Sequence, residues 1–253
     1  MPTHFLGLTG AATLATRQFQ LTGRIIDDLV NAAAVGVVHG PAGAGKTFAV
    51  AAHLEQIRES GVQPITFVSL AFPSKPTMLR VATELTYALT GAMPASSRSR
   101  FQLIANLVGL LSGARRLVVI DEAQRLNGEC IELLRHLHDH QETAFALLYV
   151  GGDGCWEVLS REPMLRSRVF RRLPFKPLAR EAIPDLMRGY HQIYRDAETA
   201  LLLEVDDSYA HGTLRDWAAF THTAAALCRE TERERLDAAV VANAYTLLGG
   251  GVE

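Results

Sequence analysis

The chain has 253 residues, of which 48% are hydrophobic and 21% are charged, and its formal net charge is −2. This composition excludes a largely disordered chain, and no apolar run is long enough for a membrane-spanning helix. The three cysteines form no CxxC pair, which favours a reducing cytoplasm over a disulfide scaffold or zinc site. The first residues carry no basic charge before their apolar stretch, so they are a poor match to a secretory signal. Attraction to nucleic acid would need a local basic patch.

Up to Pro177, short apolar runs alternate with helix-like stretches. Continuous apolar runs separated by amphipathic stretches are typical of buried parallel strands joined by crossover helices. Pro76 suits the first turn of a helix, where its missing N–H costs nothing. The expected strands are 35–39, 65–70, 117–121, 145–150 and 169–175, and the expected helices are 46–60, 76–91, 99–112 and 129–140.

After Pro177 no strand pattern remains. Helical periodicity covers 183–196, 198–204, 213–229 and 234–247, with Gly212 as a break. The charge changes near the same place, from seven basic residues and one acidic residue in 161–180 to thirteen acidic and six basic residues in 181–253. We therefore predict an α/β core with a parallel sheet flanked by helices over 1–177, and a small all-helical domain over 178–253.

A phosphate-binding motif follows the first expected strand directly. Residues 40–47 read GPAGAGKT, which fits G-x-x-x-x-G-K-[ST] completely, and a helical pattern follows at once. Its glycines let backbone N–H groups surround a phosphate, and the helix N-terminus adds positive charge. We expect Lys46 to bridge the β- and γ-phosphates of ATP and Thr47 to ligate Mg²⁺. The candidate nucleotide-binding residues are Gly40, Pro41, Ala42, Gly43, Ala44, Gly45, Lys46, Thr47 and Phe48.

Two acids end the strand expected at 117–121. Asp121 at the tip of a buried strand is placed to hold Mg²⁺, and Glu122 is placed to polarise an attacking water as general base. Alone, such a pair usually means a strand end with solvated acids. Together with the upstream phosphate loop it predicts hydrolysis, because an enzyme that transfers phosphate to a small acceptor must exclude a poised water.

These motifs, in this order and spacing, resemble those of AAA+ ATPases over roughly residues 15–230. They imply a P-loop NTPase core with a C-terminal helical lid. The DEAQ sequence at 121–124 and the YVGG turn at 149–152 look most like transposition regulators of the TnsC, TniB and Mu B kind, and like the related ExeA-type ATPases.

The resemblance implies further catalytic residues. Arg168, and as second choice Arg166, are similar to the arginine finger that reaches a neighbouring subunit's nucleotide, although exposed arginines are common. Arg215, in Gly212-Thr213-Leu214-Arg215, is similar to the sensor-2 arginine of the lid. The sequence departs from the family at sensor 1, the polar residue that AAA+ ATPases usually carry just after the fourth strand to orient water. Here the only polar residue close behind the expected strand at 145–150 is Asp153, and an acid is unfavourable beside a triphosphate.

The resemblance also implies partners. We expect a ring or filament that binds ATP and Mg²⁺ between subunits, assembles on double-stranded DNA and recruits a transposase or a similar protein. Candidate DNA contacts are Lys75, Arg80, Arg98 and Arg100, although a solvated helical surface explains them equally well. The alternatives are an AAA+ switch that does not bind DNA, such as an ExeA-like assembly or signalling factor, and a P-loop kinase acting on a small molecule.

Overall fold

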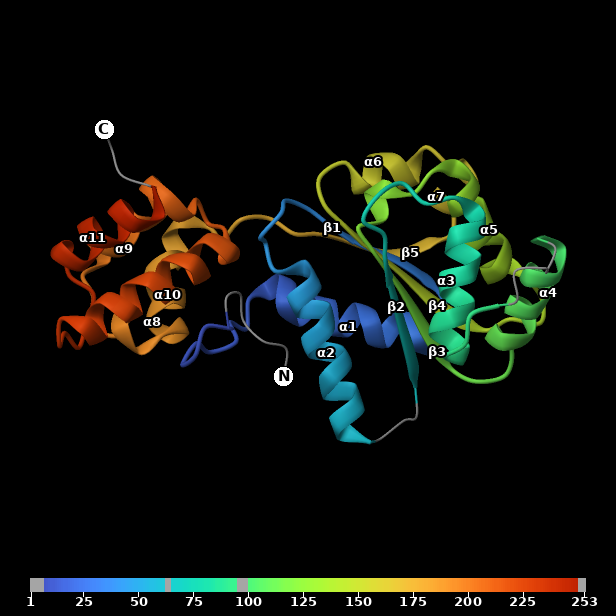
Figure 1. Cartoon of the computed structure of the whole chain (residues 1–253), viewed down its shortest axis with the longest axis horizontal. Coiled ribbons are helices and arrows are strands. Elements are labelled where there is room, and N and C mark those ends of the chain that lie inside the picture. Colours follow the sequence, from blue (N-terminus) through green and yellow to red (C-terminus); the bar gives the residue numbers. More distant parts are fainter. Residues whose placement is uncertain (1–6, 62–64, 95–99, 250–253) are drawn as a thin grey trace. The chain divides into compact units, whose positions relative to one another are not determined.

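The computed structural model describes residues 7–61, 65–94 and 100–249. The chain divides into two compact units, each of which is described by itself (Figure 1). The sheet unit consists of Gln20–Gly40 and Ala49–Phe175. The helical unit consists of Met1–Phe19, Pro41–Phe48 and Lys176–Glu253, so it includes most of the phosphate-binding motif. The functional division at residues 177 and 178 stays a prediction.

The sheet unit is built on five parallel strands, which confirms the expected α/β class. In the order β2-β3-β4-β1-β5, strand β4 lies between β3 and β1, and all the pairs are parallel. The carboxyl end of β4 therefore stands between the strand that leads into the phosphate loop and the strand that ends in the two acids. The strands are β1 (Val35–His39), β2 (Thr66–Ala71), β3 (Arg116–Asp121), β4 (Phe145–Gly151) and β5 (Val169–Pro174).

Helices cover both faces of the sheet (Figure 1). Val37 and Ile120 face a core shared with α3, α4 and α5. On the opposite face, a Cβ added at Gly36 would lie 2.5 Å from Leu29 Cδ1 on α1, so this glycine permits close packing. The helices are α1 (Arg17–Ala32), α2 (Lys46–Ser60), α3 (Met78–Thr90), α4 (Arg100–Leu111), α5 (Gly128–Asp139), α6 (Cys155–Ser160) and α7 (Pro163–Arg166).

The first turn of α3 differs from the prediction. The helix begins at Met78 and not at Pro76, because Thr77 takes the N-cap position and its Oγ1 accepts a hydrogen bond from Arg80 N at 3.2 Å. The Pro76 carbonyl instead accepts from the Asn127 side chain at 3.4 Å. Pro76 therefore belongs to the loop that joins β2 to α3.

The C-terminal part of the helical unit confirms the expected all-helical structure. Its core includes Trp217, Tyr194 and, from the N-terminal segment, Leu8. The helix expected over 183–196 ends earlier, at Tyr190, whose carbonyl accepts a hydrogen bond from Ala12 N at 2.7 Å. The helices are α8 (Ile183–Tyr190), α9 (Thr199–Val205), α10 (Leu214–Glu230) and α11 (Ala238–Leu248), with a π-helical turn at Asp206–Ala210 and 3₁₀ turns at Arg180–Ala182 and Gln192–Tyr194.

Cys130, Cys155 and Cys228 are free thiols and all three are buried. In the described ranges, no helix combines the length and the apolar character that crossing a membrane requires.

Candidate functional site

The phosphate loop begins where β1 ends, and its first glycine lies against Phe175, the residue that follows β5. Phe175 N donates a hydrogen bond to His39 O at 2.6 Å. A Cβ added at Gly40 would lie 2.3 Å from Phe175 O, so only glycine fits there. Gly43 and Gly45 follow with φ angles of 76° and 90°, in the left-handed region that favours glycine. The motif glycines are therefore required by close approach and by backbone conformation.

Lys46 is buried and lies across the loop that precedes it. Only 8% of the residue is exposed, and its Nζ donates a hydrogen bond to Pro41 O at 2.7 Å. The first turn of α2 begins at this residue, so the positive end of the helix dipole faces the loop. The arrangement concentrates positive charge at a backbone turn, as phosphate binding requires.

The N-terminus of α10 contacts the same loop. Arg215 N donates to Gly43 O at 3.1 Å. A Cβ at Gly43 would lie 2.5 Å from Thr213 Cγ2, and one at Gly45 would lie 2.9 Å from Leu214 Cδ1. The structure therefore brings the sensor-2 candidate Arg215, which is exposed, to the phosphate loop.

A buried carboxylate shapes the turn that leads to Arg215. Asp206 Oδ1 accepts hydrogen bonds from Gly212 N at 2.8 Å and from Trp217 Nε1 at 2.9 Å, and only 5% of Asp206 is exposed. Gly212 has a φ of 70° and lies close to the Leu178 backbone, so the break predicted there is real. Sequence reasoning missed Asp206, because its partners are six and eleven residues away.

The two acids lie at the carboxyl end of β3, as predicted. Asp121 Oδ1 accepts from Glu122 N at 2.8 Å. Glu122 has a φ of 54° and a ψ of 37°, a left-handed conformation that is uncommon for a residue with a side chain. The Asp121 carboxylate is therefore bonded to the backbone of the turn, and the chain leaves the extended conformation of β3 at Glu122.

Two neighbours in the chain hold the Glu122 carboxylate. Gln124 Nε2 donates to Glu122 Oε2 at 2.8 Å, and Arg125 Nε lies 3.4 Å from the same oxygen. Gln124 Oε1 also accepts a hydrogen bond from Gly152 N at 2.9 Å, after the end of β4. Sequence analysis did not assign a role to Gln124. Asp153, the polar residue noted after this strand in the sequence as unfavourable for sensor 1, is exposed.

The two finger candidates differ in their surroundings. Arg168 Nε lies 2.7 Å from Asp139 Oδ1, and its Nη1 donates to Met164 O at 2.8 Å. Arg166, the last residue of α7, is exposed, and among the described residues it forms no ion pair. The first choice from the sequence is therefore already engaged within its own chain.

The four DNA candidates are not all equally available. Lys75 and Arg100 are exposed. Arg80 is exposed too, but its guanidinium is 2.6 Å from Glu84 Oε1, which offsets its charge. Arg98 lies outside the described residues.

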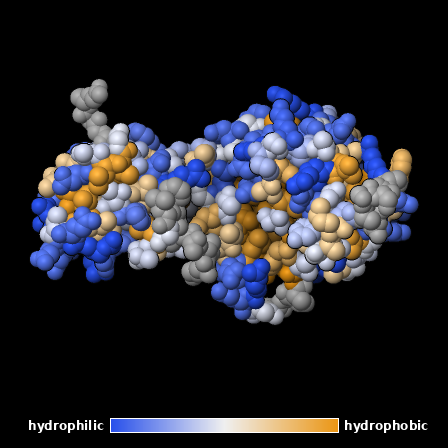
Figure 2. Space-filling view, viewed as in Figure 1, coloured by the Kyte–Doolittle hydropathy of each residue, from blue (hydrophilic) through white to orange (hydrophobic). Residues whose placement is uncertain are grey.

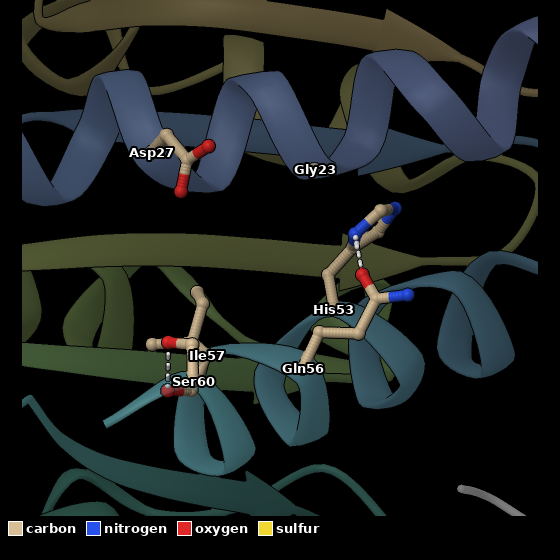
Figure 3. Close-up of a pocket in the computed structure, with 6 residues that line it drawn as sticks. All are labelled: Gly23, Asp27, His53, Gln56, Ile57 and Ser60. Atoms are coloured by element: carbon tan, nitrogen blue, oxygen red, sulfur yellow. Dashed lines mark hydrogen bonds between the residues drawn. The ribbon is translucent and has the colours of Figure 1, made fainter. Parts of the chain in front are cut away.

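A separate hollow lies between α1 and α2 (Figure 3). His53 and Gln56 project into it from α2 and share a hydrogen bond of 3.0 Å, while Asp27 approaches from α1. None of its lining residues is a predicted nucleotide or DNA contact. They are Gly23, Asp27, His53, Gln56, Ile57 and Ser60.

Several solved structures share the fold. Cdc6p from Pyrobaculum aerophilum has a TM-score of 0.72 at 19% identity, over 94% of this chain and 68% of that one. Aeropyrum pernix ORC1, solved in complex with DNA, has a TM-score of 0.67 at 18% identity, over 93% and 66%. The Holliday junction branch migration motor RuvB of Thermotoga maritima has a TM-score of 0.58 at 19% identity, over 90% and 69%. These likenesses establish the fold.

Sequence comparison identifies the family. No curated protein sequence matches the chain significantly. A protein family described as AAA domain matches residues 30–159, slightly more than half of the chain. The matched region runs from the end of α1 into α6, and so contains the phosphate loop, both acids and Gln124. The chain is a member of the AAA domain family.

Proposed function

We propose that the chain binds ATP with Mg²⁺, hydrolyses it, and uses the cycle to control the assembly of several copies on double-stranded DNA. The observation that carries this proposal is the phosphate loop, with Lys46 buried against it and Arg215 bonded to its Gly43 backbone. Asp121 and Glu122 at the carboxyl end of β3 add oxygen ligands and a base. Cations, a metal-binding carboxylate and a water-orienting acid are the parts that ATP hydrolysis needs.

Each group has a distinct role in the reaction. Lys46 exchanges its bond to Pro41 O for phosphate oxygens. Asp121 and the Thr47 hydroxyl supply the hard oxygen ligands that suit Mg²⁺, which neutralises phosphate charge when bound. Glu122 takes a proton from water as the water oxygen bonds to the γ-phosphorus, and the bond from that phosphorus to the ADP oxygen breaks.

Assembly completes the site in this proposal. Arg166 or Arg168 of one copy offsets charge on the γ-phosphate bound by the next copy, and residues 178–253 serve as the lid of the nucleotide-binding core at 1–177. Self-association is supported by exposed apolar side chains on and between α3 and α4, and hydrophobic groups also lie open to solvent on the face in Figure 2. These side chains are Leu79, Tyr87, Met93 and Phe101.

The most specific part of the proposal is that the chain binds DNA and regulates transposition. Structures with the same fold include ORC1 in complex with DNA and the branch migration motor RuvB. Among the described DNA candidates, only Lys75 and Arg100 are exposed and outside an ion pair, so a single copy would bind weakly through these candidates. A ring or filament multiplies these phosphate contacts. The DEAQ and YVGG sequences support a regulator of the TnsC, TniB or Mu B kind, acting in target selection and transposase recruitment.

The ATPase level is tested by turnover at increasing protein concentration. The specific activity should rise with concentration, and Glu122→Gln should lower kcat by roughly 100-fold or more while nucleotide binding persists. Electron microscopy of Glu122→Gln with ATP should then reveal trapped assemblies. Calorimetry without any adenine-nucleotide binding in the presence of Mg²⁺ would overturn the proposal, and so would wild-type turnover by Glu122→Gln.

The rival functions predict different outcomes. A small-molecule kinase would form no ADP without an acceptor, whereas this proposal expects ADP from ATP and water alone. Duplex DNA should raise the ATPase rate in low salt and lose its effect as salt is increased. A rate indifferent to DNA at every salt concentration would favour an ExeA-like or signalling switch, and would leave the ATPase proposal intact.

A further inference from the structure

Strand β4 ends without a side chain that can orient a water or the base. Gly151 and Gly152 follow Val150, and the next polar residue, Asp153, is exposed. The space beside these glycines is occupied by the Gln124 side chain, which comes from the 3₁₀ turn Ala123–Arg125 after β3. The amide group of Gln124, which follows β3, therefore lies beside the end of the neighbouring strand β4.

The hydrogen bonds of Gln124 determine which way its amide faces. Gly152 N–H can only donate, so the amide oxygen Oε1 faces it at 2.9 Å. An ionised Glu122 can only accept, so the amide nitrogen Nε2 faces Glu122 Oε2 at 2.8 Å. Gln124 thus links the base candidate to the backbone that follows β4.

The glycines make room for this amide. A Cβ at Gly151 would lie 2.6 Å from Gln124 Oε1 and 2.4 Å from Cys155 Sγ. A Cβ at Gly152 would lie 3.2 Å from Gln124 Nε2. Neither glycine has a positive φ, so their backbone conformation does not require glycine. The YVGG sequence is therefore explained by the space that Gln124 and Cys155 occupy.

We propose that Gln124 is the positioning residue for Glu122 and supplies the amide that strand β4 lacks. This inference rests on the proposed function, in which Glu122 is the general base. The contacts from Gln124 and from Arg125 Nε both reach Glu122 Oε2, and no hydrogen bond to Oε1 from a described residue competes for that oxygen. Gln124 therefore holds one carboxylate oxygen and leaves the other to accept the proton of a water.

The linkage also couples the base to the sheet. Strand β4 lies between β1, which leads into the phosphate loop, and β3, which carries Asp121. Because Gly152 follows β4 directly, a displacement of that strand end moves the Gln124 amide and, through it, the Glu122 carboxylate. Through Gln124, the position of the Glu122 carboxylate therefore depends on the position of β4, the central strand of the sheet.

Gln124→Met is the primary test, because methionine has a similar length and volume but no strong hydrogen-bonding group. We expect kcat to fall by roughly 10- to 100-fold, since a misplaced base loses alignment with its water. The dissociation constant for a fluorescent ADP analogue should change by less than about twofold, because in this proposal Gln124 acts through Glu122 and does not bind the nucleotide. Unchanged kcat in a folded Gln124→Met protein would overturn the proposal.

Gln124→Glu tests the hydrogen-bonding logic through the pH profile. The new carboxylate keeps an acceptor for Gly152 N–H but faces Glu122 with a second negative charge. Two close carboxylates share a proton, so the acid limb of the kcat profile should move to higher pH by about one unit or more. An unmoved limb in a folded Gln124→Glu protein would show that residue 124 does not reach the Glu122 carboxylate, and that result would overturn the proposal.

Two glycine variants test the proposal independently if substitutions at residue 124 prevent folding. Gly152→Ala places a Cβ against the Gln124 amide and should lower kcat, whereas Gly109→Ala, with open space around its Cβ, should leave kcat unchanged. Glu122→Gln is measured in parallel. Wild-type turnover in Glu122→Gln would remove the base and so the proposed function. Loss of turnover there, with normal kcat in Gln124→Met and Gly152→Ala, would remove only the role of Gln124.

Discussion

Arg168 and Asp139 form an ion pair in which Arg168 Nε lies 2.7 Å from Asp139 Oδ1. This pair connects the segment before β5 to the end of α5. The same carboxylate also pairs with Arg135 at 2.6 Å. Burial raises the Asp139 pKa, but the hydrogen bond and charge of Arg168 and the contribution of Arg135 outweigh it, so that the pKa lies below its ordinary value. Arg168 therefore has an ion-pair partner in its own chain, and Arg166 has no ion-pair partner among the described residues.

We therefore expect Arg166→Ala to abolish the increase of ATPase activity with protein concentration, while Arg168→Ala leaves much of that increase. Arg168→Ala should instead lower the free energy of unfolding by about 1 kcal/mol, because this pair is partly exposed. Activity at two protein concentrations and chemical denaturation separate the two effects. Full concentration dependence in Arg166→Ala, together with its loss in Arg168→Ala, would restore Arg168 as the finger.

The second prediction concerns the turn that Asp206 organises. Asp206→Ala leaves Gly212 N–H and Trp217 Nε1–H without their buried acceptor, at a cost of about 2–4 kcal/mol in the free energy of unfolding. Nucleotide affinity should also fall, because this turn leads into Arg215. Asp206→Asn keeps the Oδ1 acceptor and should cost less than about 1 kcal/mol. Equal losses in the two variants would show that the charge, and not the hydrogen bonds, matters.

The third prediction compares two fully buried tyrosines. The Tyr149 hydroxyl has no hydrogen-bond partner among the described residues, whereas the Tyr194 hydroxyl lies 2.7 Å from Thr221 Oγ1. Tyr149→Phe removes an unsatisfied buried group and should raise the free energy of unfolding by about 1 kcal/mol. Tyr194→Phe should lower it by a similar amount, about 1 kcal/mol. Equilibrium urea denaturation measures both, and destabilisation by Tyr149→Phe would contradict the assignment.

The fourth prediction is a loss of stability in mild acid. Burial lowers the pKa of His138 below its ordinary value near 6.5, and the neutral ring contacts Ala33 O at 3.0 Å. Burial also lowers the pKa of His191. Because the unfolded chain binds protons more readily at these sites, their contribution is present above pH 6.5 and is lost as the pH falls from there through the folded pKa values.

Thermal denaturation between about pH 7.5 and 5.5 tests this sign. His138→Gln can still donate to Ala33 O but does not titrate, so the unfolding temperature should depend less on pH. The control is His136→Gln, at an exposed position on the same helix, which should keep the dependence of the natural chain. A steeper slope in His138→Gln would contradict the direction of the pKa change.

The sheet was predictable because its interior strands are buried on both faces. Val35–His39 was expected with the observed ends, and the runs that became β3 and β4 were placed within one residue. Such strands carry unbroken apolar sequences, which are readable without knowledge of their neighbours. Helix α2 was likewise expected at its observed bounds, 46–60, because the phosphate motif marks its start. Helix α1 was not assigned, although its apolar residues follow a helical period.

Features that depend on contacts between residues far apart in the sequence could not be predicted. The expected helix at 183–196 ends at Tyr190, where the His191 ring contacts Thr9 O at 3.3 Å, a residue from the other end of the chain. The pairing of Arg168 with Asp139 spans 29 residues, and the bond from Gln124 to Gly152 spans 28. Local periodicity carries no information about such contacts, so the motifs were visible but the groups that orient them were not.

The buried thiols have a practical consequence for following assembly. Burial raises the pKa of Cys130 and of Cys228, which leaves little reactive thiolate, and Cys155 is also enclosed. The native chain should therefore react slowly with maleimide dyes. Phe101→Cys, at a side chain that is 82% exposed, would offer one fast-reacting position. A single fluorophore can then report on neighbouring copies without first removing the natural cysteines.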